Sequence, residues 1–343
     1  MTLTRTFPTD RAAGLPLADT RLLVAAMVES DTTGKPRAGV LPSHYNPLVT
    51  GTAGMAYQVA TFAAVTARAG MGAELVANDG AATVATTAAP GANSRVDVIW
   101  VRSLFTTTGD AGTDPVFGVT QGVAAASPSK PSIPAGALEL ATAVVLSTTT
   151  QTSTAVITQT HAYTTMEGGT VALRNQADMD AWTPADGSTA YRIDTGVTHR
   201  RVGGAWRAWD SDWITYTPTT TISVGDTGTA VTKYKYEGGR VRVYGRWTIH
   251  SGGTISGRAT LALPVARAAL AHPYEQAPEL GTYFQAGITR SHRITVQADN
   301  TSTTVARLGY GLPYLTGDVT STNPANPIAV GDTIHVNFTY DPA

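Results

Sequence analysis

Seven histidines and two close aspartate pairs are the residues in this sequence that could support acid–base or metal chemistry. The pairs are Asp178/Asp180 and Asp210/Asp212; a glycosidase needs two carboxylates across a sugar, one of them with a raised pKa. Aspartates two residues apart in turn-rich sequence are more often turn or cap residues. No histidine stands at metal-ligand spacing from another, and no HExxH, GxSxG, P-loop or GxGxxG pattern occurs. The sequence therefore predicts no catalytic residue, no metal ligand and no cofactor.

Aromatic side chains in the last third of the chain favour binding instead. Sugars stack their apolar faces on tryptophan or tyrosine, while polar neighbours bind the hydroxyl groups. Tyr310-Gly-Leu-Pro-Tyr314 has the composition of an exposed loop. The alternative is that each tyrosine packs in a core or a subunit interface with its hydroxyl satisfied. The predicted glycan-binding residues are Tyr274, Tyr283, Tyr310, Tyr314, Asp299 and Arg290.

The composition limits the classes of protein that can present such residues. The 343 residues are long enough for two or three domains, and 42% of them are hydrophobic. Charged residues make up only 14%, and the net charge is −1, which argues against binding of nucleic acids or membranes through bulk basic charge. About 56 threonines, with 34 Gly and 19 Pro, favour a mainly β fold. The excess of arginine over lysine indicates a GC-rich genome.

Three absences bear on where the protein is expected to act. Cysteine is missing, so no disulfide framework or cysteine-ligated metal site is expected. The longest apolar run, Leu22–Val28, falls far short of the roughly 20 residues that span a membrane. The first residues have no apolar core of a secretory signal, so no such signal is expected.

Residues 1–162 form the first predicted domain, which is rich in strands. Leu17–Ser30 fits a helix or a buried strand, and Met55–Thr66 reads as one strand. Asn78-Asp-Gly80 predicts a tight turn. Arg95–Val101 is the clearest strand here, and its alternation predicts one apolar face and one mixed face. The apolar face would carry Val96, Val98 and Trp100, opposite Asp97, Ile99 and Val101.

Residues 163–212 form a small predicted module. Asn175–Trp182 could be a short helix, capped by Asn175 or Gln176. Gly203-Gly204 predicts a two-residue hairpin turn. Because so short a module has little core, its tryptophans are the expected packing anchors: Trp182, Trp206 and Trp209.

Residues 213–343 form the third predicted domain. Arg240–His250 alternates strictly, as a strand with one buried and one solvated face does, and Glu237-Gly-Gly239 supplies the turn before it. Ile334–Tyr340 repeats the alternation. Short strands separated by turn-rich segments predict a C-terminal β-sandwich, jelly-roll-like in arrangement.

Two segments of the first domain carry a family resemblance. Arg95-Val-Asp-Val-Ile-Trp-Val101 resembles a strand of tailed-phage minor tail and baseplate proteins. The proline-punctuated segment Gly122–Ala141 is similar to the one that follows that strand in the family, with Ala124 in place of a family proline. The Asp-x-Arg end of the family domain is absent, and Ile157–His161 stands there, so the boundary at residue 162 is open.

The later sections show weaker matches to phage tail proteins. The module resembles one found after that domain, through Tyr191–Gly196 and Arg201–Trp206. The last section resembles receptor-binding heads through Trp213–Pro218, Leu263-Pro-Val265 and Gly331-Asp-x-Ile334. The resemblance implies a virion protein at the tail tip or baseplate, assembled in the host cytoplasm. It also implies a homotrimer, with residues 1–162 docked to other baseplate proteins and residues 213–343 facing the host.

The leading hypothesis is a non-enzymatic minor tail protein that acts as a receptor-binding adhesin for a host cell-surface glycan through residues 213–343. Its expected partners are two further copies of itself, baseplate proteins and that glycan, with no nucleic acid and no membrane insertion. A purely structural baseplate component is the alternative. A cell-wall glycan hydrolase is disfavoured by the missing motifs, and a bacterial carbohydrate-binding surface protein by the missing signal peptide.

Overall fold

A computed structural model describes the chain in these ranges: 4–5, 17–32, 35–41, 47–255, 259–268, 279–286, 290–298, 302–312, 315–318 and 329–343. The protein is mainly β, as the composition predicts. It divides into two compact units. The N-terminal unit is Met1–Thr195 with Arg200–Trp206, and the C-terminal unit is Gly196–His199 with Arg207–Ala343. The finer division at residues 162 and 212 stays a prediction.

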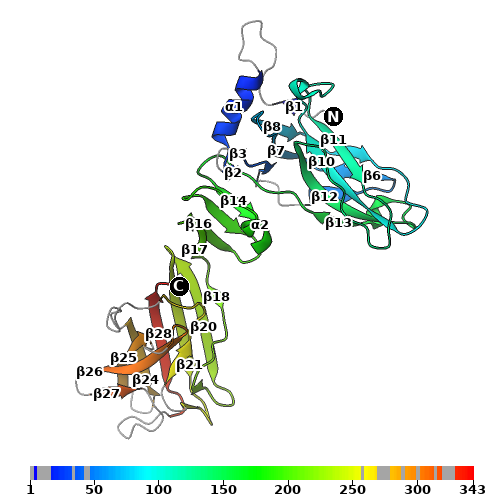
Figure 1. Ribbon diagram of the computed structural model, residues 1–343. Coiled ribbons are helices and arrows are strands. Elements are labelled where there is room, and N and C mark those ends of the chain that lie inside the picture. Colours follow the sequence, from blue (N-terminus) through cyan, green and yellow to red (C-terminus); the bar gives the residue numbers. More distant parts are fainter. Residues whose placement is uncertain are drawn as a thin grey trace. The chain divides into compact units, whose positions relative to one another are not determined.

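Four small sheets build most of the N-terminal unit (Figure 1). The first has the order β1 (Thr4–Arg5), β8 (Ala73–Asn78), β7 (Phe62–Ala67), β4 (Gly39–Val40). The second has the order β11 (Val116–Gln121), β10 (Ser94–Arg102), β12 (Ala137–Leu146), β13 (Val156–Gln159). The two smaller sheets pair β5 (Val49–Gly51), β6 (Ala56–Val59) and β9 (Ala82–Ala85), and β2 (Ser30–Thr32) with β3 (Lys35–Pro36). Residues of three of these sheets, among them Val40, Tyr57 and Ile99, share one buried cluster.

The segment between Leu17 and Ser30 is a helix rather than a strand up to Met27. Helix α1 (Leu17–Met27) packs Val24 against Val65 and Ala73 of the first sheet. Its other side leaves Leu22, Leu23 and Met27 exposed.

One strand prediction in this unit is wrong. Met55–Thr66 is not one strand, because the chain leaves one sheet at the end of β6 and enters another at β7. The segment Asn78–Gly80, where a tight turn is predicted, connects β8 to β9, which belong to different sheets and do not pair. A local turn pattern cannot show which sheet the following strand joins.

The predicted strand at Arg95–Val101 is β10, and both of its faces contribute buried residues. Arg95, Asp97, Ile99 and Val101 of the mixed face are buried; on the apolar face Val98 is buried, whereas Val96 and Trp100 are half-buried. Burial of the charged residues is possible because Arg95 Nε donates to Asp97 Oδ1 at 2.8 Å, so that the two charges compensate each other.

The predicted short helix is α2 (Gln176–Asp180), and Asn175 caps it through a bond from the Asp178 N–H to Asn175 Oδ1 at 3.0 Å. This helix connects β14 (Thr170–Leu173) to β15 (Thr189–Arg192), which pair in parallel. Trp182 and Trp206 are packing anchors here, as predicted, with ring centroids 5.1 Å apart. Trp182 also donates to the Ser30 carbonyl at 2.9 Å, which ties this segment to the preceding sheets.

The boundary between the two units runs through β16 (Val197–Val202) and β17 (Ala205–Ser211). The glycines between them have the left-handed backbone of a hairpin turn, with φ of 61° at Gly203 and 75° at Gly204, as predicted. Trp209 does not anchor the small module. It belongs to the C-terminal unit, where its carbonyl accepts the Gly239 N–H at 2.9 Å.

A nine-stranded antiparallel sheet dominates the described part of the C-terminal unit. Its order is β18 (Ile214–Thr215), β20 (Thr229–Glu237), β21 (Arg240–Thr248), β28 (Thr333–Tyr340), β24 (Glu279–Gln285), β25 (Arg290–Ala298), β26 (Val305–Leu312), β23 (Thr260–Ala262), with β27 (Leu315–Asp318) also on β26. A separate pair joins β19 (Ile222–Ser223) to β22 (Thr254–Ile255). Figure 1 shows these strands in yellow-green to red. The predicted hairpin at Glu237–Gly239 joins β20 to β21.

One buried cluster joins strands from distant parts of the sheet. Val243 and Trp247 of β21 share a buried cluster with Leu261 of β23 and Leu308 of β26, which lie near the other end of the strand order. The sheet therefore curves around its core, and only one face of β21 and β28 is buried, as the alternation predicts. We call the opposite face of these strands the outer face. No helix in the described part of the chain is long and apolar enough to cross a membrane.

Candidate functional site

The predicted glycan-binding residues fall on different parts of the C-terminal unit. Tyr274, Tyr314 and Asp299 lie outside the described residues. Tyr283 lies in β24 opposite Ile334, and Arg290 is the first residue of β25, opposite Gln285.

Tyr310 is in a strand, not in the loop that the sequence predicted. It lies in β26, opposite Ile294 of β25 and Gly317 of β27. Glycine and proline at residues 311–313 suggested a loop, but β26 continues through Leu312 because β27 pairs with it.

The structure brings a different set of aromatic and basic residues together on the outer face. The alternation of β20, β21 and β28 points these side chains away from the core, and the strand register then sets their neighbours. Lys233 lies opposite Tyr244, Tyr244 opposite Asn337, and Arg246 opposite His335. We define the aromatic–cationic face as Trp213, Lys233, Lys235, Arg242, Tyr244, Arg246, His335 and Asn337.

Three aromatic rings form a row across this face. The ring centroids of Trp213 and Tyr244 are 6.4 Å apart, and those of Tyr244 and His335 are also 6.4 Å apart. Both contacts are edge-to-face, the geometry that the ring quadrupoles favour. Trp213 is 44% exposed. The three packed rings form an apolar strip within an otherwise polar surface.

Basic side chains surround the aromatic row. Lys235 Nζ lies 5.4 Å from the centroid of the Trp213 ring and 2.8 Å from Glu237 Oε1. Arg242 Nε donates to Asn337 Oδ1 at 3.0 Å, and its Nη1 lies 3.5 Å from Glu237 Oε2. The Glu237 carboxylate thus forms ion pairs with both Lys235 and Arg242. The hydrogen bond from the Lys235 ammonium lowers the pKa of the Glu237 carboxyl group. Counting Lys233 and Arg246, the face carries more positive than negative charge.

His335 contributes a neutral ring at physiological pH. Burial lowers the pKa of its imidazole, and the nearby Arg246 lowers it further. A neutral imidazole has one donor and one acceptor nitrogen, so it can either donate a hydrogen bond to a hydroxyl group or accept one from it.

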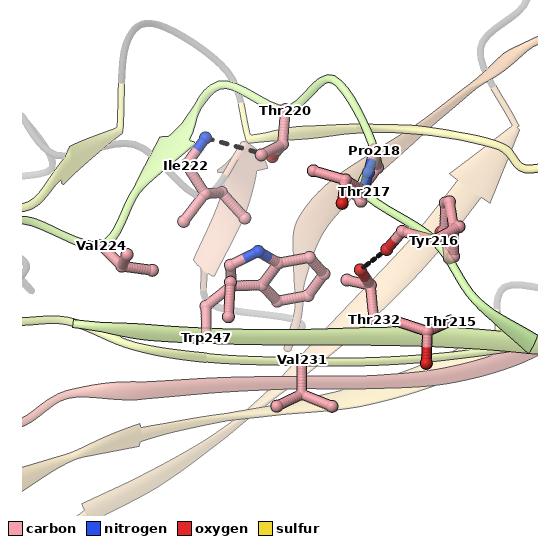
Figure 2. Close-up of a pocket in the computed structure, with 11 residues that line it drawn as sticks. Thr215, Tyr216, Thr217, Pro218, Thr220, Ile222, Val224, Val231, Thr232 and Trp247 are labelled. Carbon is pink, nitrogen blue, oxygen red and sulfur yellow. Dashed lines mark hydrogen bonds between the residues drawn. The ribbon is translucent and has the colours of Figure 1, made fainter.

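A pocket lies on the other side of β20, under the segment from Thr215 to Val224. Figure 2 shows the Trp247 indole pointing toward this segment, while Val231 points away from it. The volume is about 280 Å³, and the lining contains no charged residue. Two lining threonines already use their hydroxyls, since Thr232 donates to the Tyr216 carbonyl and Thr220 to the Thr260 carbonyl. The hydroxyl of the lining residue Tyr216 is buried without a partner in the described residues, and no charged group stands beside it to orient a ligand, so we assign no ligand to this pocket.

Three of the four aspartates considered for catalysis have structural partners. Asp178 forms an ion pair with Arg174 at 3.1 Å, and Asp180 accepts from Gln176 Nε2 at 2.7 Å. Asp210 accepts the Gly238 N–H at 3.0 Å, a turn role of the kind that the sequence favoured. No group of three histidine or acidic residues in the described ranges could hold a metal ion.

One surface cluster combines the residue types of a catalytic triad without its geometry. His250 Nδ1 contacts both Thr227 Oγ1 at 2.5 Å and Asp226 Oδ1 at 2.9 Å. In a triad the nucleophile and the carboxylate use different ring nitrogens. Because both partners here share one nitrogen, the cluster cannot relay a proton from the threonine.

The N-terminal unit places its most buried carboxylate, Asp97, in a closed network. Asp97 accepts from Arg95, from Tyr57 Oη at 3.0 Å and from Thr86 Oγ1 at 2.6 Å. Arg95 also donates to the carbonyls of Thr87 and Ala88 at 2.8 and 2.6 Å. Burial raises the pKa of Tyr57, so its hydroxyl remains a donor. The Asp97 carboxylate, the Arg95 guanidinium and the Tyr57 hydroxyl all have hydrogen-bond partners within the protein. The network therefore stabilises the unit and leaves no group free to bind a substrate.

Comparison with known proteins gives no relative: no family model, no curated protein and no solved structure matches this chain.

Sequence reasoning missed the aromatic–cationic face. The alternation in Arg240–His250 and Ile334–Tyr340 correctly gave the solvated positions of two strands. What the sequence did not show is that β21 pairs with β28, which lies about 90 residues further along the chain. It also did not show that β20, on the other edge of β21, brings Lys233 next to Tyr244. Aromatic residues at solvated strand positions, such as Tyr244, were the available signal.

Proposed function

We propose that this chain is a minor tail or baseplate protein of a tailed bacteriophage that binds a host cell-surface glycan. The observation that carries the proposal is the aromatic–cationic face on a unit with its own core. An aromatic row with polar and charged neighbours suits sugars, which offer apolar ring faces and hydroxyl rims. The proposed role is binding and not catalysis.

The family resemblance falls on positions with strong structural demands, which supports the proposal. Gly122 has no room for a side chain, since a Cβ there would lie 2.9 Å from the Val96 carbonyl oxygen. Gly136 has a φ of 77°, which glycine adopts readily. Arg95 and Asp97 form the buried ion pair. The residues shared with the tail-protein pattern are thus ones that hold this type of domain together.

The proposal includes an assembly. In it the N-terminal unit attaches to the virion, and the C-terminal unit is a jelly-roll-like β-sandwich displayed by a homotrimer. The curved sheet around one core is compatible with a sandwich. The exposed Leu22, Leu23 and Met27 of α1 support contacts of the N-terminal unit with other proteins, because exposed apolar clusters often mark interfaces.

A structural baseplate component without receptor binding is the second candidate, favoured by the same apolar helix face. Cell binding separates the two. The fluorescently labelled full chain should bind saturably to one or more strains in a panel of GC-rich Gram-positive bacteria, and periodate oxidation of the cell surface should abolish that binding. Absence of saturable binding across the panel would favour the structural role.

A further inference from the structure

The middle of the aromatic–cationic face carries positive charge that no carboxylate in the described residues neutralises. Lys233 and Arg246 have no acidic partner among them, and they flank Tyr244: Lys233 lies opposite it in β20, and Arg246 lies two residues along β21. At the end of the same strand, Arg240 is paired with Asp341 at 2.9 Å. The face therefore has paired cations at its edge and two unpaired cations beside the aromatic row.

Both unpaired cations can reach a ligand lying on the row. Arg246 is exposed and Lys233 is half-buried, and both occupy solvated positions of their strands. Arg246 has Val231 on one side and His335 on the other, because these residues oppose it in the register. Val231 is 42% exposed and widens the apolar strip. A ligand at this point meets apolar surface and a guanidinium group together.

We propose that this face binds an anionic sugar chain, whose ring faces pack on Trp213 and Tyr244 while its acidic groups bind Lys233 and Arg246. The proposal rests on the proposed function and deepens it by naming the site and the ligand class. Charge-assisted bonds to a carboxylate, sulfate or phosphate are about twice as strong as neutral ones. A neutral sugar would cover the two cations without compensating them, which costs free energy.

A nucleic acid fits the face less well. Proteins that bind nucleic acids carry an extended basic stripe and a basic domain, whereas this chain has a net charge of −1. Glu237 further limits the positive region, since it neutralises part of the charge of Lys235 and Arg242.

Calorimetric titration of the full chain tests the proposal, with oligogalacturonate as the anionic probe and a maltooligosaccharide of equal length as the neutral one. We expect the anionic probe to bind more tightly, and its affinity to fall as NaCl rises from about 50 mM to about 500 mM. Lys233→Ala and Arg246→Ala should each weaken binding about tenfold, and Trp213→Ala should weaken it as well. Arg240→Ala, the matched control with a paired cation, should change the affinity less than about twofold.

Three results would overturn the proposal: equal affinity for both sugars, no loss of affinity in the Lys233 and Arg246 variants with unchanged circular dichroism, or tighter binding of single-stranded DNA than of oligogalacturonate. Cell binding by the same variants separates this inference from the proposed function. If the chain binds cells and these variants bind equally well, the face is wrong and the adhesin role stands. If the probe binds at this face and no cell in the panel is bound, the adhesin role fails.

Discussion

Two groups of charged side chains, one in each unit, lie in opposite surroundings. In the N-terminal unit Asp97 is fully buried, and it accepts hydrogen bonds from Arg95, Tyr57 and Thr86. In the C-terminal unit Lys233 and Arg246 lie on a solvated sheet face without an acidic partner in the described residues. A buried and fully bonded charge maintains a fold, whereas an exposed and unpaired charge beside aromatic rings is available to a ligand. This difference is the reason that we propose the C-terminal unit, and not the N-terminal one, as the ligand-binding unit.

The largest expected effect comes from breaking the buried network. Asp97→Ala leaves the Arg95 guanidinium buried without its carboxylate, so the N-terminal unit should lose about 3–5 kcal/mol of stability. Hydrogen exchange measured by mass spectrometry on the full chain reports each unit separately. Arg246→Ala is the contrasting variant, with an expected change within about 0.5 kcal/mol in the C-terminal unit. Similar losses in both variants would contradict the comparison.

A glycine substitution should destabilise the C-terminal unit alone. A Cβ on Gly245 would lie 2.3 Å from the Trp247 ring and 2.9 Å from Val336 Cγ2, both in the core. Gly245→Ala should therefore cost about 1–3 kcal/mol by overpacking. Hydrogen exchange should quicken in β20, β21 and β28 and stay unchanged in β10 and β12. Faster exchange in β10 would show that the two units do not unfold independently.

The helix cap offers a smaller test in the N-terminal unit. Asn175→Ala removes the side-chain acceptor for the Asp178 N–H, so we expect a loss of about 1 kcal/mol. Chemical denaturation of the full chain measures it. Asn175→Ser, which keeps a capping oxygen, is the control and should retain most of the stability; equal losses in the two variants would argue against a capping role.

The smallest expected change in stability is the pH dependence that His161 contributes. Its ring is buried against Tyr163, Nε2 has no partner in the described structure, and burial lowers the pKa of the imidazole. The folded state thus binds fewer protons than the unfolded one, so stability is complete above the unfolded pKa of about 6.5 and falls as the pH drops below it.

Thermal unfolding between about pH 7 and pH 5 measures this dependence. The wild-type N-terminal unit should become less stable toward pH 5, and His161→Asn, which cannot titrate, should show a shallower slope over the same range. An unchanged slope in the variant would assign the pH dependence to other groups.

Local patterns predicted the elements whose cause is local. The β20–β21 hairpin follows from the strict alternation in Arg240–His250 and from the glycine turn before it, and the α2 cap follows from Asn175. The sequence left the Leu17–Met27 helix unresolved, because a short apolar run suits a helix or a buried strand equally well.

Non-local pairing explains the rest. The alternation in Arg95–Val101 did not show that the mixed face of β10 is buried, because that burial depends on the Arg95–Asp97 ion pair and on the bond from Tyr57. The aromatic–cationic face depends on the register between β21 and β28, which residue spacing does not encode. The predicted loop at Tyr310 failed for the same reason, since β27 pairs with β26 there.

Binding of the Lys233→Ala/Arg246→Ala double variant to host cells tests the central claim most directly. The labelled full-length variant should be compared with wild type and with Arg240→Ala at equal stability and equal oligomeric state. The account predicts that the double variant loses saturable cell binding by about tenfold or more while Arg240→Ala binds like wild type. Cell binding that is equal in all three proteins would contradict the claim that the outer face of the C-terminal unit is the binding surface.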